Sequence, residues 1–480
     1  MIRACYFILI VQSLDQVLTD RYSASLLEDL LKDYDSVVRP VENPNDNLKV
    51  FLGIKLSQIA DIDERNQIMT TNVWIRHEWT DYKLKWEPEK YGNITKIKIP
   101  TSKIWTADVV LYNNADGDYH VSTQTKATVH YDGRIIWEPP MIYKSYCSIN
   151  IEYYPFDIQD CYMKFGTWTF NGGLIDLEHL NKSQSDPINY KLTHEVSTQI
   201  YTVETGIDMS DYYESVEWDI LSIPAQKNVK YYDCCIEPFV DIHFNITLRR
   251  KTLFYTVNLI IPCVNISFLS VLVFYLPSSS GEKITLGIYV LVALLVFYLL
   301  LIELIPPTSL VIPLLGKYLL FTLILVNLSI LLSIFILNLH HRNPKTHKMP
   351  LWMRNLLLEV LPKYLFIKRP NVLSLMDVDE KVMEVRNDQF GKNEFEKYPG
   401  NIKSALLGMN YIQEKMRQNK IETKEADDWK YAAMVVDRLL LVIFSVTFFV
   451  GTFGILLKAP SIYDSRLPIG KQHKQETLTF

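Results

Sequence analysis

Long apolar runs dominate the second half of the chain. Four of them, at residues 253–276, 284–305, 318–339 and 435–457, are each long enough to cross a hydrocarbon core of about 30 Å as a helix. We therefore predict that residues 251–339 hold three membrane spans and that residues 435–457 form the fourth. The third span is predicted to begin at residue 318, because Pro313 and Gly316 interrupt the apolar residues before it.

The first half has the pattern of a β-sheet protein. After a short amphipathic stretch at residues 23–35, which predicts a helix, runs rich in Val, Ile, Thr, Trp and Tyr alternate with turns as far as Arg250. Many short strands at this spacing are typical of an antiparallel β-sandwich of about 200 residues. The expected fold class is therefore mixed: a β-sandwich at residues 19–250 is followed by a four-helix transmembrane bundle.

The flanks of the spans predict the sides of the membrane. Residues 1–18 have the basic start and apolar run of a signal peptide, which would place the sandwich outside the cell. The basic residues at 340–342 fit a cytoplasmic side, so residues 340–434 should be cytoplasmic and residues 458–480 extracellular. The basic residues at 249–251 break the positive-inside rule, and we expect them to have partners in the sandwich.

The predicted cytoplasmic region contains two helical segments. Residues 350–368 interleave Leu, Trp and Phe with Lys and Arg, as an amphipathic helix at a membrane interface does. Residues 402–433 should form a long helix that continues unbroken into the fourth span. The charged residues at about 371–400 have no pattern of regular structure.

The second span carries polar residues on one helical face. At helical spacing this face bears Glu282, Thr285, Tyr289, Val292, Val296, Leu300 and Glu303. Charged groups at membrane depth are costly and usually face a water-filled path, so the stripe favours the wall of a pore, where rings of Glu would attract cations. The alternative is an ordinary buried helix with its two Glu residues at the membrane interfaces.

The chain has six cysteines. Cys147 and Cys161 bracket a short loop, whose closure by a disulfide would stabilise the fold by about 3 kcal/mol. The adjacent Cys234 and Cys235 could form a strained bridge that shapes a loop tip, or remain free thiols, or bind a metal, although zinc-ligand spacing is missing. The other two, Cys5 and Cys263, lie in apolar segments and are not expected to pair.

Charge and motif content exclude several functions. The net charge of −5 gives no reason to expect nucleic acid as a partner. No grouped nucleophile, base and orienting residue suggests an enzyme, and no cofactor or metal motif is found. Three glycosylation sequons, at Asn93, Asn181 and Asn245, fit an extracellular sandwich.

Several ordered motifs resemble those of the pentameric Cys-loop receptors. They are YPFD at residues 154–157 within the cysteine loop, GEKITL at 281–286, and HHR at 340–342. The adjacent Cys234 and Cys235 make the chain similar to an α-type subunit of the nicotinic acetylcholine receptors. The resemblance implies a ring of five subunits around a pore, with a vicinal disulfide beside a ligand site between neighbouring sandwiches.

The resemblance also implies which residues bind the ligand. Aromatic rings occupy the family positions on the principal face at Tyr112, Trp168, Tyr232 and Phe239, and on the complementary face at Trp74. A quaternary ammonium has no hydrogen to donate, so stacked ring faces bind it, at about 1–2 kcal/mol per desolvated ring. A sandwich also needs aromatic residues in its core, and Trp79, Trp86, Trp105 and Trp218 are expected to be structural.

Further charged residues resemble positions that couple binding to gating. Lys164 and Asp241, with Tyr232, resemble a cluster that rearranges when the loop bearing Cys234 closes. Asp108 resembles the aspartate that braces the loop carrying Trp168. Glu64 and Arg250 resemble an ion pair at the membrane end of the sandwich, which is better suited to a switch than to stability. Without the resemblance, each would more often be a solvated surface charge.

The chain departs from the family pattern at several positions. An insertion near residues 179–205 could cover the site, cap the vestibule or be disordered. Phe239 replaces a tyrosine, and Ser279 lacks an extra inner carboxylate. Tyr289 and Val292 stand where the family has Ser or Thr and Leu, and five tyrosines at one level predict a constriction.

These observations together predict a neurotransmitter-gated, cation-selective channel subunit. It would be a multi-pass protein of the plasma membrane, including the postsynaptic membrane. It would bind a small-molecule agonist resembling acetylcholine and assemble as a homopentamer or heteropentamer. The alternative is an accessory, receptor-like subunit that does not conduct alone. An anion channel is disfavoured, because Glu282 directly follows Gly281 without the proline and alanine of chloride members.

Overall fold

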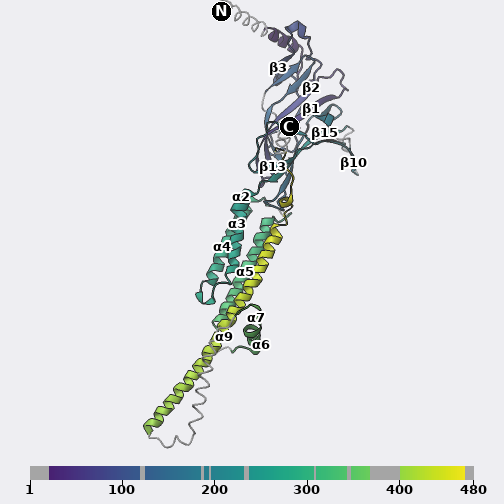
Figure 1. Cartoon of the computed structure of the whole chain (residues 1–480). Helices are drawn as coiled ribbons and strands as arrows, with labels where there is room; N and C mark the ends of the chain where they lie inside the picture. The colour runs from purple at the N-terminus through teal and green to yellow at the C-terminus, as the bar shows by residue number, and fades with distance from the viewer. Residues whose placement is uncertain are drawn as a thin grey trace, which may run out of the picture. The chain divides into compact units, whose positions relative to one another are not determined.

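The computed structural model describes residues 21–118, 125–184, 189–193, 196–231, 237–307, 310–342, 348–367 and 400–470 (Figure 1). Its contacts define two compact units. One comprises Met1–Leu253, Ile302–Pro313 and Ala459–Phe480, and the other comprises Phe254–Leu301 and Leu314–Lys458. The predicted signal peptide and most of the charged stretch near residues 371–400 lie outside the described residues.

The first unit is a sandwich of two β-sheets, as the alternating pattern predicts. The first sheet contains β1 (Leu48–Asp63), β2 (Ile68–Thr80), β3 (Lys96–Pro100), β5 (Lys126–His130), β6 (Arg134–Trp137), β7 (Pro140–Tyr146), β9 (Ile175–His179) and β12 (Ile207–Asp208). The second contains β4 (Val109–Leu111), β8 (Ile158–Thr167), β10 (Asn189–Thr193), β11 (Val196–Val203), β13 (Trp218–Ser222), β14 (Ala225–Lys230) and β15 (Phe239–Arg250). Pairing is antiparallel except where β9 and β12 join β1.

Strand β15 shows how the pattern builds the core. Phe244, Ile246 and Leu248 are buried, whereas the residues between them are only partly buried, so one face of the strand packs between the sheets. The ring of Phe244 meets that of Phe165 on β8 edge to face, with centroids 5.8 Å apart. The four tryptophans expected to be structural, at positions 79, 86, 105 and 218, are all buried.

The predicted disulfide between Cys147 and Cys161 is present, with Cα atoms 5.0 Å apart. It joins the end of β7 to β8 and closes the loop that carries Asp157. Cys263, the one free cysteine recorded among the described residues, is buried, as its apolar surroundings predict.

The inserted segment near residues 179–205 is partly ordered as sheet. Strand β11 pairs antiparallel with β14, and β10 pairs with β11, so the insertion adds a hairpin to the edge of the second sheet. Disorder, one of the three alternatives for this insertion, is therefore ruled out for these strands, and a role in covering the site or capping the vestibule stays a prediction. The amphipathic stretch at 23–35 is helical over residues 21–31.

The second unit contains the apolar helices. Its elements are α2 (Leu253–Tyr255), η4 (Thr256–Ile260), α3 (Ile261–Leu272), α4 (Lys283–Leu304), α5 (Leu314–His340), α6 (Leu351–Arg354), η6 (Asn355–Val360), α7 (Leu361–Tyr364) and α9 (Gly400–Leu456). Four stretches, Leu253–Leu272, Lys283–Leu304, Leu314–His340 and Tyr411–Leu456, are long and apolar enough to cross a membrane. The four predicted spans are confirmed at the level of helix number and order.

Two predicted boundaries are wrong. The first span ends at Leu272 rather than at residue 276, and the third begins at Leu314 rather than at residue 318. Pro313 directly precedes α5, where its missing N–H costs nothing, and Gly316 is buried inside the helix. Leu314, Leu315 and Leu319 are buried with Gly316, and this burial outweighs the low helix propensity of glycine.

Both predicted helical segments after the third span are confirmed. Helix α9 is continuous over 57 residues, so the polar helix does run into the fourth span. In the segment from α6 to α7, Leu358 packs against Tyr431 and Val435 of α9, while Trp352 is exposed. This division into an apolar face and an exposed face is that of an amphipathic helix.

Buried His77 gives a prediction for stability. Its ring stacks on Trp137 at 5.0 Å, and burial lowers the pKa of His77 to about 4. The unfolded chain therefore binds more protons than the folded one between about pH 4 and pH 6.5, and stability falls as the pH falls through that range. His77 alone should cost about 2 kcal/mol between pH 7 and pH 5.

We expect His77→Phe to reduce the drop in melting temperature between pH 7 and pH 5, measured on the detergent-solubilised chain. The control is His130→Gln, at a partly exposed position of β5, which should keep the drop of the unchanged chain. An equal drop in all three proteins would contradict this account of His77.

Candidate functional site

Two of the predicted binding rings lie together. Tyr112 follows β4 and Trp168 follows β8, and their ring centroids are 6.3 Å apart. The Tyr112 hydroxyl donates a hydrogen bond to the carbonyl oxygen of Thr167, at 2.5 Å. Trp168 is 67% exposed, so its ring is accessible to a ligand.

The loop that carries Trp168 is fixed by Asp108. The Trp168 N–H donates to the carbonyl oxygen of Asp108 at 3.2 Å, and the Thr169 N–H donates to the Asp108 carboxylate at 2.6 Å. Asp108 therefore holds the loop by both main chain and side chain, in the place where the resemblance puts a bracing aspartate.

The remaining predicted binding residues are Phe239, Trp74 and three that are not described. Phe239 is partly buried at the start of β15, which pairs antiparallel with β8, the strand that ends just before Trp168. Trp74 lies on β2 of the other sheet, 46% exposed, with the Lys55 ammonium 5.1 Å from its ring centre. Tyr232, Cys234 and Cys235 lie outside the described residues, so their vicinal disulfide stays a prediction.

A charge cluster beside these rings surrounds Asp241. Its carboxylate lies 3.2 Å from the Lys164 ammonium and accepts a hydrogen bond from Asn228 at 2.9 Å. His243 was not predicted, yet its Nε2 lies 3.0 Å from Asp241. Burial alone would raise the pKa of Asp241, but His243, Asn228 and Lys164 together lower it. The alternation of β15 could have identified His243, because residues two apart share a face.

Arg250 is the centre of a second, deeper network. Its guanidinium is fully buried, 2.6 Å from Glu64 and 2.8 Å from Asp157. Burial acts to lower the pKa of Arg250, but the two carboxylates raise it above its ordinary value. The predicted ion pair between Arg250 and Glu64 is thus present. The second partner, Asp157, was not predicted, although it belongs to the YPFD motif.

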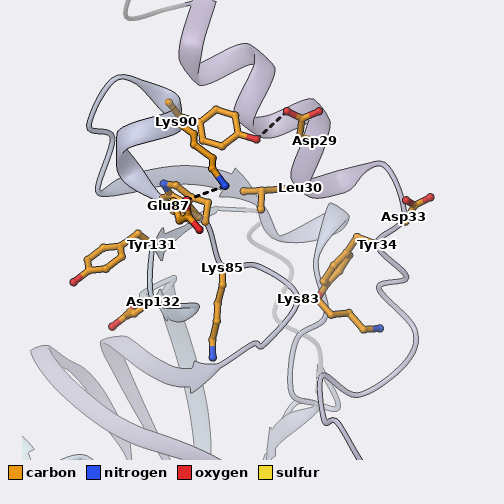
Figure 2. Close-up of a pocket in the computed structure, with 12 residues that line it drawn as sticks. Asp29, Leu30, Asp33, Tyr34, Lys83, Lys85, Glu87, Lys90, Tyr131 and Asp132 are labelled. Carbon is orange, nitrogen blue, oxygen red and sulfur yellow. Dashed lines mark hydrogen bonds and ion pairs between the residues drawn. The ribbon is translucent and has the colours of Figure 1, made fainter.

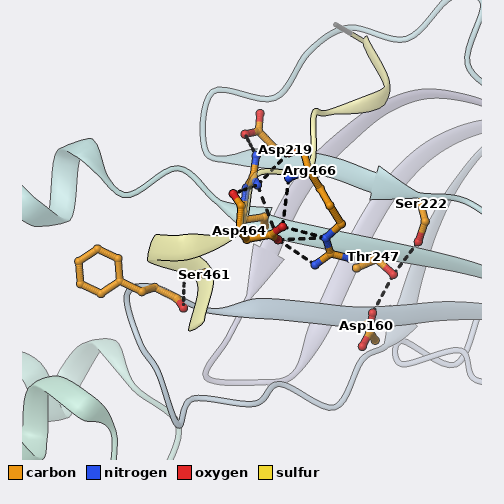
Figure 3. A network of polar contacts seen from close by, with 9 residues as sticks. Asp160, Asp219, Ser222, Thr247, Ser461, Asp464 and Arg466 are labelled. Atoms are coloured by element: carbon orange, nitrogen blue, oxygen red, sulfur yellow. Dashed lines mark hydrogen bonds and ion pairs between the residues drawn. The ribbon is translucent and has the colours of Figure 1, made fainter. Parts of the chain in front are cut away.

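The basic residues beside Arg250 also have partners, as expected. The side chains of Arg249 and Lys251 both lie 3.5 Å from the Asp219 carboxylate. Arg249 also lies 3.7 Å from Asp464, which in turn pairs with Arg466 (Figure 3). These contacts explain how basic residues are tolerated at that point of the chain.

On α4, the predicted pore stripe lies within a broad exposed surface that also includes Ile288, Leu295, Leu299 and Ile302. Tyr289, Val292, Val296 and Leu300 are 45–69% exposed, whereas Gly287, Val290, Leu294 and Leu301 are buried against neighbouring helices. Glu282 and Glu303 are also exposed, and Thr285 is partly so. The stripe lies opposite the buried side of the helix, so it is available to line a path formed with other copies, but exposure alone does not distinguish it from the rest of the exposed surface.

Other features carry less weight. The sequon residues Asn93 and Asn181 are exposed and Asn245 is partly buried.

A cavity of about 1050 Å³ lies beside the helical residues 21–31, lined by charged and aromatic residues that include Asp29 and Tyr34 (Figure 2). None of the predicted ring residues lines it, so it is separate from the predicted binding site.

Two family models match most of the chain. The neurotransmitter-gated ion-channel ligand binding domain matches residues 23–252, and the neurotransmitter-gated ion-channel transmembrane region matches residues 259–390 and 374–456. The chain belongs to the neurotransmitter-gated ion-channel family. The resemblance drawn from the motifs is therefore confirmed.

Curated relatives match this chain over nearly their whole length. The chain is 46% identical to the acetylcholine receptor subunit alpha-like of Manduca sexta, over 92% of this chain and 91% of the relative. It is 46% identical to the acetylcholine receptor subunit alpha-type unc-63 of Caenorhabditis elegans, over 93% and 94%. It is 41% identical to the neuronal acetylcholine receptor subunit alpha-2 of Homo sapiens, over 90% and 87%.

Membership of the neurotransmitter-gated ion-channel family settles the class of protein. The chain is a subunit of a ligand-gated channel and not an enzyme. Members assemble as pentamers that bind small-molecule agonists, and they are multi-pass plasma-membrane proteins, in agreement with the four candidate spans.

Gly166 gives a prediction for the binding rings. A Cβ built on Gly166 would collide with the Tyr112 ring. We expect Gly166→Ala to displace Tyr112 and weaken agonist binding by about tenfold, as the loss of one ring contact would. Gly173→Ala is the matched control, because its Cβ would meet no atom closer than 3.4 Å. Radioligand displacement on membranes measures both, and unchanged affinity in Gly166→Ala would refute the packing argument.

Proposed function

We propose that the chain is a subunit of a cation-selective channel opened by an acetylcholine-like quaternary ammonium. The observation that carries this proposal is the exposed Trp168 ring beside Tyr112, on a loop fixed by Asp108. Relatives named as acetylcholine receptor subunits support the choice of agonist. Residues 19–250 would form the extracellular ligand-binding domain, residues 340–434 the cytoplasmic region, and residues 458–480 an extracellular tail.

The proposed site lies between two subunits. Tyr112 and Trp168 follow strands of the second sheet, whereas Trp74 lies on the first. One chain carries both faces, so it could bind agonist at every interface of a homopentamer or share interfaces with related subunits. Loop closure over the agonist by Tyr232, Cys234 and Cys235 completes the proposed box.

Cation selectivity is supported by the exposed face of α4. Its carboxylates, Glu282 and Glu303, flank a mostly apolar stripe, and rings of carboxylates concentrate cations and repel anions. In the proposed gating step, agonist binding perturbs Lys164 and Asp241, and the change reaches the first span through Arg250. A ligand that favours the open form by a few kcal/mol is sufficient for such a shift.

An accessory, non-conducting subunit is the second candidate. Tyr289 favours it, because this exposed side chain is bulky at a level where five copies would face one another. Expression of the chain alone in oocytes, with acetylcholine, choline and nicotine applied under voltage clamp, separates the two candidates. Current that reverses with the sodium gradient supports the first, and surface protein without current supports the second.

Replacing Trp168 tests the binding site. We expect Trp168→Ala to weaken binding of a quaternary ammonium by about 5–30-fold, the loss of one cation–π contact. Trp352→Ala is a matched control, because Trp352 is also 67% exposed but lies on α6. Radioligand competition measures both, and retained affinity in Trp168→Ala would assign that ring to the fold alone.

Replacing Tyr289 tests the constriction. Serine at this position removes five rings from one level of the pore, so Tyr289→Ser should raise unitary conductance. Tyr298→Ser, on the same helix but off the stripe and less exposed, is the control. Single-channel recording measures both, and equal conductance in the unchanged chain and Tyr289→Ser would argue against a constriction there.

A further inference from the structure

A buried ion pair lies at the start of α4. Lys283, the first residue of the helix, has a side chain with no exposed surface, and its ammonium pairs with the Asp437 carboxylate on α9. Asp437 is itself only 7% exposed. The pair therefore fixes the direction of the Lys283 side chain, toward α9 and away from the exposed face of α4.

Two further contacts hold this arrangement. The hydroxyl of Ser278, in the turn before α4, donates to the second oxygen of Asp437 at 3.0 Å. The Lys283 ammonium also lies 5.8 Å from the ring centre of Phe274. The carboxylate thus uses both oxygens, and the ammonium has a carboxylate and a ring face, so the buried charges are compensated within the subunit.

The position of Lys283 in the sequence makes its direction important. It directly follows Glu282, which is exposed at the beginning of the proposed pore stripe. If the Lys283 ammonium turned toward the proposed pore, an assembled pentamer would have a ring of five positive charges beside the ring of five Glu282 carboxylates. The two rings would largely cancel, because opposite charges at such short separation screen each other's field.

We propose that Asp437 is a positioning residue for ion permeation: it withdraws the Lys283 ammonium from the pore, so that Glu282 sets the field at this end. The inference rests on the proposed cation channel and adds a residue of α9 to it. A buried ion pair is by itself weak evidence for stability. At this position, the direction in which the Lys283 side chain points matters more than the free energy that the pair contributes.

The test is single-channel recording of the full-length chain in oocytes. Asp437→Asn should release the Lys283 ammonium and lower unitary sodium conductance by about twofold or more, because a positive ring repels cations. The double variant Lys283→Gln, Asp437→Asn should restore the conductance, since no ammonium remains to face the pore. If the pair only stabilises the fold, the double variant should keep the lowered conductance, or Asp437→Asn should change only the amount of protein at the cell surface. Either result would contradict the proposal.

A matched control lies on the same helix. Asp428 of α9 is also buried and pairs with Arg354 of α6, at 3.1 Å. Asp428→Asn removes a paired carboxylate without freeing a charge next to the pore stripe, so its conductance should equal that of the unchanged chain. An equal loss in Asp428→Asn and Asp437→Asn would overturn the proposal.

Lys283→Gln alone keeps the test decisive if Asp437→Asn does not reach the surface. Since the ammonium is already withdrawn, its removal should leave conductance unchanged. A severalfold rise would mean that Lys283 faces the pore in the unchanged chain, which would overturn the inference.

A chemical readout separates this inference from the proposed function. If no agonist evokes current, the channel proposal fails, but the orientation of Lys283 can still be measured by acetylating the detergent-solubilised chain with a water-soluble amine-reactive ester. Mass spectrometry should find Lys283 protected in the unchanged chain and modified in Asp437→Asn, with exposed Lys317 modified in both. Equal modification of Lys283 in the two proteins would refute the inference.

Discussion

The buried guanidinium of Arg250 is the constraint on which the sandwich depends. A charge with no exposed surface is tolerated only if it is paired, and this one is held by Glu64 and Asp157 and lies 4.3 Å from the ring centre of Trp218. These partners come from the β1–β2 turn, the cysteine loop and β13, so three segments must be in place together at the end of β15. Moving one segment alone would leave a buried charge unpaired, at a cost of several kcal/mol, and this favours movement of the group as a unit.

The second unit uses the same principle at Lys283. Both Arg250 and Lys283 are paired with carboxylates of the same chain, whereas Glu282, beside Lys283, remains exposed. Pairing a charge inside the subunit removes it from the surface field. The exposed carboxylates of α4 are then free to determine the potential along the proposed path.

The local sequence pattern was sufficient to predict the helices, the strands and the residues of the motifs. It was not sufficient to predict which residues far apart in the chain would pair. Helical and strand periodicity predicted the spans and the sandwich, and the motifs predicted the closeness of Tyr112 to Trp168 and of Glu64 to Arg250. Periodicity could not predict that Asp437 would pair with Lys283 across 154 residues, or that the insertion would extend a sheet. The start of α5 was missed for a related reason, since tertiary packing around Gly316 overrides the local signal of a helix breaker.

The proposed site requires two neighbouring subunits. Trp168 is two-thirds exposed, and Trp74 lies on the other sheet, so the proposed box would take these two rings from neighbouring subunits. Exposed apolar rings are unfavourable in water, and a neighbouring sandwich would remove both from solvent when it supplies the missing face. An agonist that binds only this completed interface must also stabilise it, because ligand binding and assembly are thermodynamically linked. In the proposed site, binding and assembly would therefore use the same aromatic surface. Gating would need only the part of the binding free energy that differs between the closed and open interfaces.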